Sequence, residues 1–503
     1  MKTRKRSDDL SADEKTAPKP SVRTQVSQYQ KNSGALKLLE DEPWFHGFTP
    51  KRAVEKKLGR LGDWLVRTTE SRRKTEIVIS VLSDGNKIIN YSIAYSRSSK
   101  KWYLGILEKK PVLFDTVTEL IEHYRTHRLP GIKFKLNRER VREPWHIERS
   151  RVEYDPDKGL LGAGNFGRVY KGKLKAAKGS DQCEEVAIKI SVDNGKKDRF
   201  ENKAKKDLHK EGLVLSNFDH ANVIKFYGMI LTKPPYMVIL EFCPGGALLD
   251  HLTKQEDKIT VGERILYLYE AAKGMNYLHR HQYTHRDLAA RNCLISRDGT
   301  IKIADFGLSQ HIQTAPDNYD KDVQIPLRWM APESLTKKPK FGTASDMWSY
   351  AVFIFEVFSN GAKPWPEEEH RRIAGKIRRC QMMEMPKSAP VEVVKFAKTV
   401  WKLNPMERPT FPEALPVMFR LHNERYPPPA PEECTVNKLK GVIRCPFDKG
   451  LEPDYNHPVK RKDAEDESEQ ESKFGTAHEN TTTTSTYQSS EMVSSEDKPP
   501  SKD

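Results

Sequence analysis

The pattern of apolar and polar positions divides the chain into two regions that resemble folded domains. In the first, residues 44–136, VEKKL has helical spacing, and DWLVRTT, EIVISVL and KIINYSIAY have the branched and alternating character of strands. LFDTVTELIEHYRTH then returns to helical spacing. This order predicts a small α+β domain in which two helices flank an antiparallel sheet. In the second region, residues 152–425, strands around a glycine cluster precede a largely helical part, which predicts a larger domain in two parts.

The two ends of the chain have a different composition. Residues 1–43 are polar, rich in Lys, Ser and Pro, and lack apolar periodicity, which predicts a disordered basic arm. Residues 426–503 begin with YPPPAPEE, contain a charged patch and a Thr/Ser tract, and predict a disordered tail. A linker at residues 137–151 completes the expected organisation.

Composition narrows the possible classes of function. The six cysteines form no C-x-x-C pair and are too sparse for a disulfide framework or a zinc module, which favours a reducing compartment. The longest apolar run, residues 350–358, is too short to span a bilayer and contains Glu356. The basic start has no apolar stretch after it, and residue 2 is Lys, so neither secretion nor N-myristoylation is expected. The net charge of +16 is spread along the chain, which favours a solvated basic surface over nucleic-acid binding.

A glycine-rich motif opens the second region. Residues 161–169 are LGAGNFGRV, with three glycines at G-x-G-x-x-G spacing: Gly162, Gly164 and Gly167. Without side chains, such a backbone can close over phosphate groups and direct its N–H groups at their oxygens. The same spacing also fits a tight hairpin that binds nothing. Val169 after the last glycine and the string VAIK at 186–189 distinguish the motif from a dinucleotide-binding fingerprint.

Charged residues in the following strings add chemistry to this motif. Lys189 lies in an apolar strand, where an unpaired ammonium is costly, so it needs an anionic partner. Glu211 in HKEGLVLSNF is the best candidate. Three strings then follow in order: HRDLAARN at 285–292, DFG at 305–307 and APE at 331–333. Together with the glycine motif and VAIK, they resemble the motifs of protein kinases.

The kinase resemblance implies a bilobal protein kinase fold, ATP as the phosphate donor and Mg²⁺ or Mn²⁺ as the metal. It implies that Lys189 holds the α- and β-phosphates, that Asp305 and Asn292 ligate the metal, and that Asp287 orients and deprotonates the acceptor hydroxyl. These residue types suit phosphoryl transfer, which depends on positioning and charge neutralisation. The apolar members of the implied nucleotide site also fit an ordinary core. The site comprises Leu161, Gly162, Gly164, Gly167, Val169, Ala187, Lys189, Glu211, Glu241, Cys243 and Leu294.

Two strings resemble tyrosine kinases in particular. In LAARN, Arg291 replaces the Lys that serine/threonine kinases usually place two residues after the catalytic Asp. PLRWMAPE at 326–333 resembles the platform that supports a phenol side chain in tyrosine kinases. Both imply transfer to tyrosine. Asp346 and Arg408 match positions that hold the larger lobe together, and Arg408 is expected to pair with Glu333.

The first region resembles an SH2 domain: PWFHGF opens it, GDWLVRTTES carries the central strand, and LIEHYR lies on the closing helix. The resemblance implies that Arg67 anchors phosphotyrosine, because a planar guanidinium can bind two phosphate oxygens, and that Thr69 and Ser71 add hydroxyls. Two departures are expected to alter phosphopeptide affinity. Lys51 or Arg52 stands where many SH2 domains place a helix Arg against the phosphate, and Asn90 stands where a His is usual.

An SH2 domain directly upstream of a tyrosine kinase domain, without an SH3 domain between them, most resembles the Fes/Fer type of cytoplasmic, non-receptor tyrosine kinase. The resemblance covers about residues 44–425 and implies two kinds of signalling partner, proteins with substrate tyrosines and tyrosine-phosphorylated proteins. It implies a cytoplasmic protein that phosphotyrosine partners recruit to the plasma membrane. The alternative is a phosphotyrosine adaptor with a silent kinase fold, and the complete set of catalytic and metal-binding residues favours the enzyme.

The stretch between DFG and APE contains a single tyrosine, Tyr319. Phosphorylation would add about two negative charges, which can pair with cationic groups and order the stretch. Arg286 is the first expected partner. Tyr319 is therefore predicted to be a regulatory autophosphorylation site, with a solvated loop tyrosine as the alternative.

Overall fold

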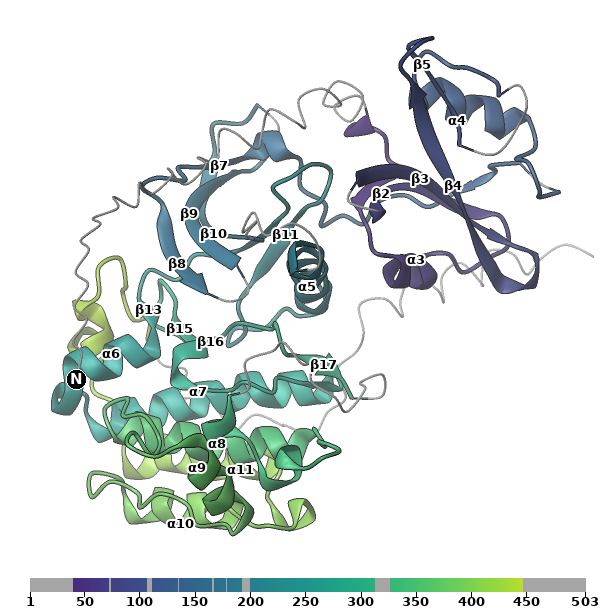
Figure 1. Cartoon of the computed structure of the whole chain (residues 1–503). Coiled ribbons are helices and arrows are strands. Elements are labelled where there is room, and N and C mark those ends of the chain that lie inside the picture. The colour runs from purple at the N-terminus through teal and green to yellow at the C-terminus, as the bar shows by residue number, and fades with distance from the viewer. Residues whose placement is uncertain are drawn as a thin grey trace, which may run out of the picture. The chain divides into compact units, whose positions relative to one another are not determined.

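The computed structural model describes residues 39–446 with the exception of 72–73, 106–110, 134, 165–166, 178, 192–199 and 313–325 (Figure 1). Most of the expected arm and the tail from residue 447 onwards lie outside the described residues. Within the described part, two α+β domains follow one another along the chain. None of the described helices combines the length and the apolar character that crossing a lipid bilayer requires.

The first domain contains β1 (Phe45–Phe48), α3 (Lys51–Lys57), β2 (Asp63–Ser71), β3 (Lys74–Ser83), β4 (Lys87–Ser96), β5 (Lys101–Leu104), α4 (Val117–Thr126) and β6 (Arg138–Glu139). Strands β2 to β5 are antiparallel, as predicted, whereas the short strands β1 and β6 pair with β2 in parallel. Trp64, Val66 and Ile79 share one core cluster with Leu120 and Ile121 of α4. Helix α3 contributes to a second cluster with residues of β2 and β3 whose side chains lie on the other face of the sheet. The predicted sheet between two helices is therefore confirmed.

The smaller lobe of the second domain contains β7 (Val152–Tyr154), β8 (Leu160–Gly164), β9 (Gly167–Lys175), β10 (Cys183–Ile190), α5 (Phe200–Leu215), β11 (Phe226–Ile230) and β12 (Met237–Glu241). Its sheet has the order β11-β12-β10-β9-β7, with β8 paired to β9. Val186 and Ile188 of the central strand β10 are buried in one cluster of this lobe. Because side chains alternate across a strand, Lys189 faces the other side of the sheet, where Figure 1 shows α5.

The larger lobe contains α6 (Leu248–Gln255), α7 (Val261–Arg280), α8 (Thr343–Phe358), α9 (His370–Arg378), α10 (Val391–Val400) and α11 (Phe411–Arg420). Its short strands are β13 (Gly246–Ala247), β14 (Tyr283–Thr284), β15 (Cys293–Ile295), β16 (Ile301–Ile303) and β17 (Gln310–His311). Helix α8 is buried on nearly all sides, which explains its largely apolar sequence. The hairpin of β15 and β16 connects the segment with the HRD motif to the segment with the DFG motif. The expected bilobal fold is confirmed.

Residues 426–446 differ from the expected disordered tail, because they pack on the larger lobe. We call this segment the C-terminal strap. Cys434, Val436 and Val442 are buried in the main core cluster of the lobe. These few apolar side chains are dispersed among prolines and charged residues, so overall composition did not reveal that the segment has enough buried surface to be ordered.

Two buried carboxylates of α7 bind the strap. The backbone N–H and the hydroxyl of Thr435 donate to Glu263 Oε1 at 2.7 and 3.0 Å. The guanidinium of Arg444 pairs with the carboxylate of Glu270 and donates from Nη1 to the Gly299 carbonyl at 2.5 Å. The strap thus adds hydrogen-bond donors to two buried carboxylates, beside those that Tyr267 and the backbone of Ile301 already supply.

The linker packs along β11 of the smaller lobe. The Met229 N–H donates to the Trp145 carbonyl at 3.0 Å, and the Ile147 N–H donates to the Met229 carbonyl at 2.9 Å. From the first domain, the Phe48 ring stacks on Tyr236 with ring centroids 4.9 Å apart. The segment expected as a linker is therefore an ordered part of the fold.

Candidate active site and anion pocket

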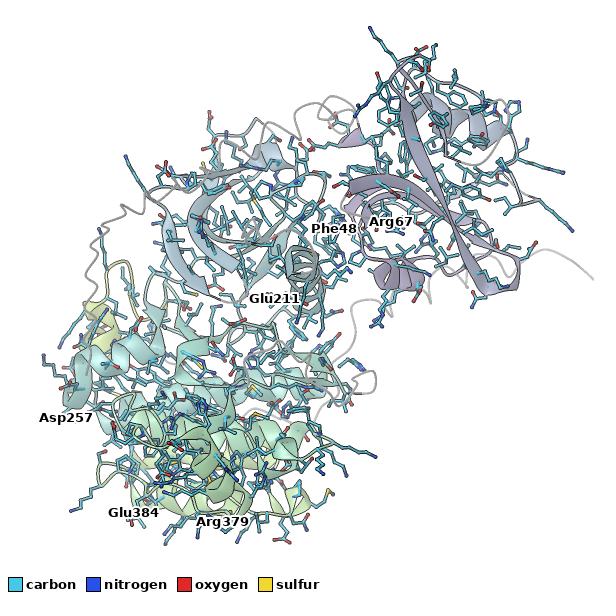
Figure 2. All side chains as sticks on the ribbon, viewed as in Figure 1. Phe48, Arg67, Glu211, Asp257, Arg379 and Glu384 are labelled. Atoms are coloured by element: carbon cyan, nitrogen blue, oxygen red, sulfur yellow. The ribbon has the colours of Figure 1, made fainter. Side chains whose placement is uncertain are left out.

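Lys189 of β10 lies at the centre of a buried charge cluster. Its Nζ lies 2.6 and 2.7 Å from the carboxylate oxygens of Glu211 on α5 and 3.4 Å from Oδ1 of Asp305 (Figure 2 labels Glu211). The exposed fractions are 7% for Lys189 and 3% for Glu211, so carboxylates take the place of water around the ammonium. The predicted pairing of Lys189 with Glu211 is present, and Asp305 joins it.

The protonation states of this cluster follow from its contacts. Burial disfavours the charged form of Lys189, but Glu211 and Asp305 outweigh burial and raise the pKa of the ammonium. Burial also opposes ionisation of Asp305, yet Lys189 and neighbouring donors hold the pKa of this carboxyl below its ordinary value. Asp305 is therefore a carboxylate at neutral pH, fixed beside a permanent cation.

Three predicted residues meet in the loop between β14 and β15. The Nδ2 of Asn292 donates to the backbone carbonyl of Asp287 at 2.7 Å and to its Oδ2 at 2.8 Å, while Arg291 forms an ion pair with Oδ1. Burial raises the pKa of Asp287, and Arg291 acts in the opposite direction. A positioned carboxylate with increased proton affinity is suited to accept a proton from a bound hydroxyl.

This loop is held by α8 and by the DFG segment. Asp346 of α8 accepts the backbone N–H groups of His285 and Arg286 at 2.8 and 2.9 Å. Arg286 and Asp305 have φ angles of 69° and 61°, which are uncommon for residues other than glycine. The His285 ring lies 5.0 Å from the ring of Phe306, which is fully buried. A buried carboxylate and a ring contact therefore fix the two chemistry-bearing segments relative to each other.

The donor set between these segments fits a hard divalent cation. Asp305 is ionised, and Asn292 uses its amide N–H groups on Asp287, which leaves the amide oxygen as an acceptor. Mg²⁺ prefers such carboxylate and amide oxygens and usually completes its shell with substrate phosphates and water. Across the described residues, no cluster of three or more His, Cys, Asp or Glu side chains forms a metal site by itself. The residues present therefore fit a cation that binds together with a phosphate ligand.

Some of the predicted nucleotide-binding residues are neighbours of Lys189 in the sheet. Val169 on β9 lies directly opposite Lys189 in the sheet register, and Ala187 lies two residues earlier on β10. Gly167 has a φ angle of 143°, and an added Cβ would lie 2.4 Å from the Ile190 carbonyl oxygen, so a side chain there would clash with β10. The remaining positions lie on neighbouring elements: Leu161, Gly162 and Gly164 on β8, Glu241 at the end of β12, Cys243 just beyond it, and Leu294 on β15.

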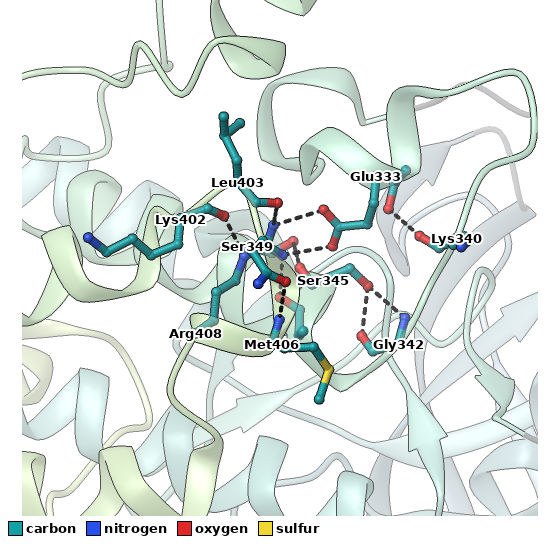
Figure 3. A network of polar contacts seen from close by, with 12 residues as sticks. Glu333, Lys340, Gly342, Ser345, Ser349, Lys402, Leu403, Met406 and Arg408 are labelled. Carbon is teal, nitrogen blue, oxygen red and sulfur yellow. Dashed lines mark hydrogen bonds and ion pairs between the residues drawn. The ribbon is translucent and has the colours of Figure 1, made fainter.

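The segment predicted as a tyrosine platform is fixed by polar contacts (Figure 3). Arg408 donates from Nη1 and Nη2 to the two carboxylate oxygens of Glu333 at 2.7 and 2.8 Å, which confirms the predicted pair. The Ser349 hydroxyl of α8 donates to the Trp329 carbonyl at 2.8 Å. Tyr319 lies outside the described residues, so its regulatory role stays a prediction.

The sequence did not reveal the role of Glu356. Its Oε2 accepts the backbone N–H of Ala290 and the indole N–H of Trp329, both at 3.0 Å. The Trp329 ring in turn lies 4.2 Å from the guanidinium carbon of Arg291. The available signal was a glutamate within an otherwise apolar helix, because a buried carboxylate requires donors from elsewhere in the fold.

Arg67 of β2 lies in a second, different site in the first domain (Figure 2). It is 3% exposed and donates to Ser80 Oγ at 2.9 Å, to the Thr49 carbonyl at 2.9 Å and to Asn90 Oδ1 at 3.1 Å. Burial lowers the pKa of Arg67 to about 10, so the guanidinium is still charged at neutral pH. A cation held by uncharged acceptors keeps its attraction for an incoming anion.

The other predicted pocket residues have different placements. Thr69 is half-buried two residues beyond Arg67 on β2, and Ser71 ends the strand. Asn90 accepts the Ser80 hydroxyl at 2.7 Å as well as the guanidinium, so the amide that replaces the usual His orients the anchor. The two candidates for the helix cation are both exposed in the first turn of α3: Lys51 and Arg52.

Known proteins match both domains. Residues 158–418 match the family described as protein tyrosine and serine/threonine kinase, and residues 44–124 match the SH2 domain. The chain is 30% identical over 381 residues to human tyrosine-protein kinase Fer, which covers 75% of this chain and 43% of Fer. It is 35% identical over 328 residues to spermatocyte protein spe-8 of Caenorhabditis briggsae, covering 65% of this chain and 60% of that protein. It is 31% identical over 378 residues to Fer-related kinase 1 of Caenorhabditis elegans, covering 74% of this chain and 92% of that protein.

The extent of these matches decides the family. The chain spans less than two thirds of the length of Fer and of spe-8, but nearly the whole of Fer-related kinase 1. The kinase match alone covers more than half of the chain, and the SH2 match lies directly upstream of it. The chain belongs to the SH2-containing, non-receptor tyrosine kinases of the Fes/Fer type.

Proposed function

We propose that this chain is an ATP-dependent protein tyrosine kinase that transfers the γ-phosphate to tyrosine hydroxyls of proteins. The observation that supports this most is the convergence of Lys189, Glu211 and Asp305 on one buried cluster, with Asp287 and Asn292 beside it. An adaptor with a silent kinase fold has no need of this complete set. The family relationship supports the same conclusion.

Each residue has a role that its contacts support. Lys189 holds the α- and β-phosphates, and its carboxylate partner keeps the ammonium in place. Asp287 orients the tyrosine hydroxyl and accepts its proton, and Arg291 holds the Asp287 carboxylate from the other side. A Mg²⁺ or Mn²⁺ ion held by Asp305 and Asn292 would neutralise charge on the transferred phosphoryl group.

The SH2 domain binds tyrosine-phosphorylated proteins through Arg67 in this proposal and brings the kinase to them. Such partners recruit a cytoplasmic kinase to the plasma membrane, where it acts in signalling. We place the SH2 domain at residues 44–136 and the start of the kinase domain at residue 152. The strap extends the kinase domain beyond residue 425 to residue 446, because its contacts are with the larger lobe.

Phosphorylation of a matched peptide pair tests the proposal. The full chain is incubated with ATP and either Mg²⁺ or Mn²⁺, and with two peptides that differ only in Tyr or Ser at the acceptor position. We expect phosphate on the tyrosine peptide alone, and Asp287→Asn is expected to lower the rate at least about a hundredfold. Comparison of the two metals identifies the better cofactor.

Two outcomes would contradict the proposal. Equal phosphorylation of the serine peptide would overturn the specificity for tyrosine. Absence of phosphate transfer with either metal, in a chain that still binds a phosphopeptide, would support the adaptor instead.

A further inference from the structure

Glu356 connects two segments that are far apart in the sequence. Its carboxylate lies on α8, in the interior of the larger lobe, and is 2% exposed. The same oxygen, Oε2, accepts the backbone N–H of Ala290 in the catalytic loop and the indole N–H of Trp329 in the platform, both at 3.0 Å. A single acceptor atom therefore links the two segments directly.

A chain of contacts leads from this carboxylate to the catalytic Asp287. The Trp329 ring lies against the guanidinium of Arg291, with the guanidinium carbon 4.2 Å from the ring centroid. Arg291 in turn forms an ion pair with Asp287. Glu356 therefore contacts the catalytic loop in two ways. It accepts the backbone N–H of Ala290 directly, and it binds Trp329 of the platform, which contacts Arg291 of the loop.

The buried cluster around Lys189, on the nucleotide side of the site, does not share these contacts. Lys189 pairs with Glu211 and Asp305, which come from α5 and from the DFG segment. None of the hydrogen bonds described for Glu356 involves these residues. A change at Glu356 is therefore expected to affect the protein substrate more than the nucleotide.

We propose that Glu356 is a positioning residue for the protein substrate, whose carboxylate aligns the catalytic loop with the peptide platform. This inference rests on the proposed kinase activity. The carboxylate accepts both N–H groups in its ionised form, whereas protonation removes the negative charge from the shared acceptor and weakens both bonds.

The electrostatic environment makes this role dependent on pH. Burial raises the pKa of Glu356 from 4.5 to about 7, against the hydrogen bonds from Trp329 and Ala290 and the nearby charge of Arg291. The Asp287 carboxylate acts in the same direction as burial, and the Cys293 thiol also interacts with Glu356. The native state therefore binds the Glu356 proton more tightly than the unfolded chain does, which stabilises the native state at low pH. This contribution to stability is lost as the pH rises through about 7. The ionised form that aligns the two segments predominates only above that pH.

Glu356→Gln tests the proposal because it keeps the size of the side chain and an amide oxygen but cannot ionise. We expect kcat/KM for a short tyrosine peptide to fall about 10- to 100-fold, because small misalignments of a reacting group are costly. The affinity for ADP without added metal, measured by calorimetry, is expected to stay within about twofold of wild type, because Lys189 and Glu211 lie outside the loop that Glu356 holds. The wild type is expected to show a rise of kcat/KM near pH 7 that Glu356→Gln lacks. Changes with pH that other groups cause are common to both profiles, so the difference between the profiles isolates Glu356.

Two further variants control for simple destabilisation. Trp329→Phe keeps a ring against Arg291 but removes the indole N–H, and is expected to show part of the same loss of kcat/KM. The effect of Trp329→Phe is expected to be much smaller in the Glu356→Gln background, because the bond that it removes is already weakened there. Glu263→Gln alters another buried carboxylate, which contacts the strap. It is expected to change thermal stability, but not to lower kcat/KM for the peptide relative to the affinity for ADP.

The possible results separate the inference from the proposed function. A wild-type chain without tyrosine phosphorylation would overturn the proposed function itself. With an active wild type, equal losses in peptide kcat/KM and ADP affinity, or an unchanged pH profile in Glu356→Gln, would overturn the positioning role. Additive effects of Glu356→Gln and Trp329→Phe would do the same.

Discussion

Both domains contain a buried cation in the site that we propose for phosphate binding, but the two cations are neutralised differently. Lys189 is 7% exposed and lies within 3.4 Å of carboxylates from two other segments. Arg67 is 3% exposed and donates to a hydroxyl, a backbone carbonyl and a side-chain amide. The kinase site thus supplies its own counter-charges, whereas Arg67 has only uncharged acceptors among the described residues, which suits a site where the proposed ligand brings the counter-charge.

This difference suits the roles that we propose for the two sites. In its proposed role Lys189 stays in one place while phosphate is bound, transferred and released, and its carboxylate partners raise the pKa of its ammonium. Arg67 must gain free energy from phosphotyrosine, and an internal carboxylate would reduce that gain. Burial alone lowers the pKa of Arg67 to about 10, which still leaves the cation intact at neutral pH.

Lys189→Met is the strongest test of the first half of the comparison. It removes the phosphate-holding cation and leaves Glu211 buried without its ammonium, so we expect activity to fall at least about a thousandfold. Lys171→Met, which breaks an exposed ion pair with Glu185, serves as a matched control and is expected to keep activity within about twofold. Initial rates on a tyrosine peptide measure both. A wild-type rate in Lys189→Met would show that this ammonium does not serve the nucleotide.

Arg444 of the strap extends the comparison, since it is a further buried cation with a carboxylate partner. Arg444→Met leaves Glu270 buried with only part of its donors, and we expect the free energy of unfolding to fall by about 3 kcal/mol. Adding Glu270→Gln is expected to restore part of that loss, because the neutral amide no longer needs the cation. Urea denaturation measures each variant. An unchanged stability in Arg444→Met would mean that the strap contributes little to the kinase domain.

The order of the strap could not be predicted from the sequence, whereas the catalytic residues could. The motifs gave Lys189, Asp287 and Asp305 because catalytic chemistry needs these residue types in a fixed order. The order of strands and helices likewise followed from apolar spacing. The ordering of residues 426–446 depends instead on where Thr435 and a few apolar side chains meet α7, and no local pattern encodes such distant contacts.

The same limit applies inside the two sites. The pair of Lys189 and Glu211 could be predicted because a buried ammonium requires an acid. The acceptors of Arg67 could not be predicted, because a backbone carbonyl and a hydroxyl on another strand are chemically unremarkable in sequence. Glu356 was visible as a charge in an apolar run, but its partners come from loops whose positions only the fold determines.

Arg67→Lys tests the second half of the comparison. Lysine keeps the positive charge but lacks the planar fork that binds two phosphate oxygens, so we expect phosphopeptide affinity to fall by about 2 kcal/mol. Phosphorylation of a short unphosphorylated peptide is expected to persist. Calorimetry with a phosphotyrosine peptide measures the affinity, and Arg60→Lys on the exposed loop before β2 is the control. Equal affinity in the wild type and Arg67→Lys would place the phosphate elsewhere.

Asn90→Asp would make the SH2 site resemble the kinase site by placing a carboxylate beside the buried cation. Its expected effect is the smallest of these predictions. Asn90 Oδ1 already accepts from the Arg67 guanidinium at 3.1 Å, so the substitution adds a carboxylate beside the cation with little change in shape. The new charge repels phosphate and neutralises its anchor, and we expect phosphopeptide affinity to fall about tenfold, less at high salt because Asn90 is exposed. Asn86→Asp adds the same charge to the turn between β3 and β4 and should change affinity much less, because Asn86 is not among the acceptors of Arg67. Calorimetry at low and high salt separates the two. An equal loss in both variants would show that the effect comes from net charge. The comparison between a cation neutralised by the protein and a cation neutralised by the ligand would then not hold.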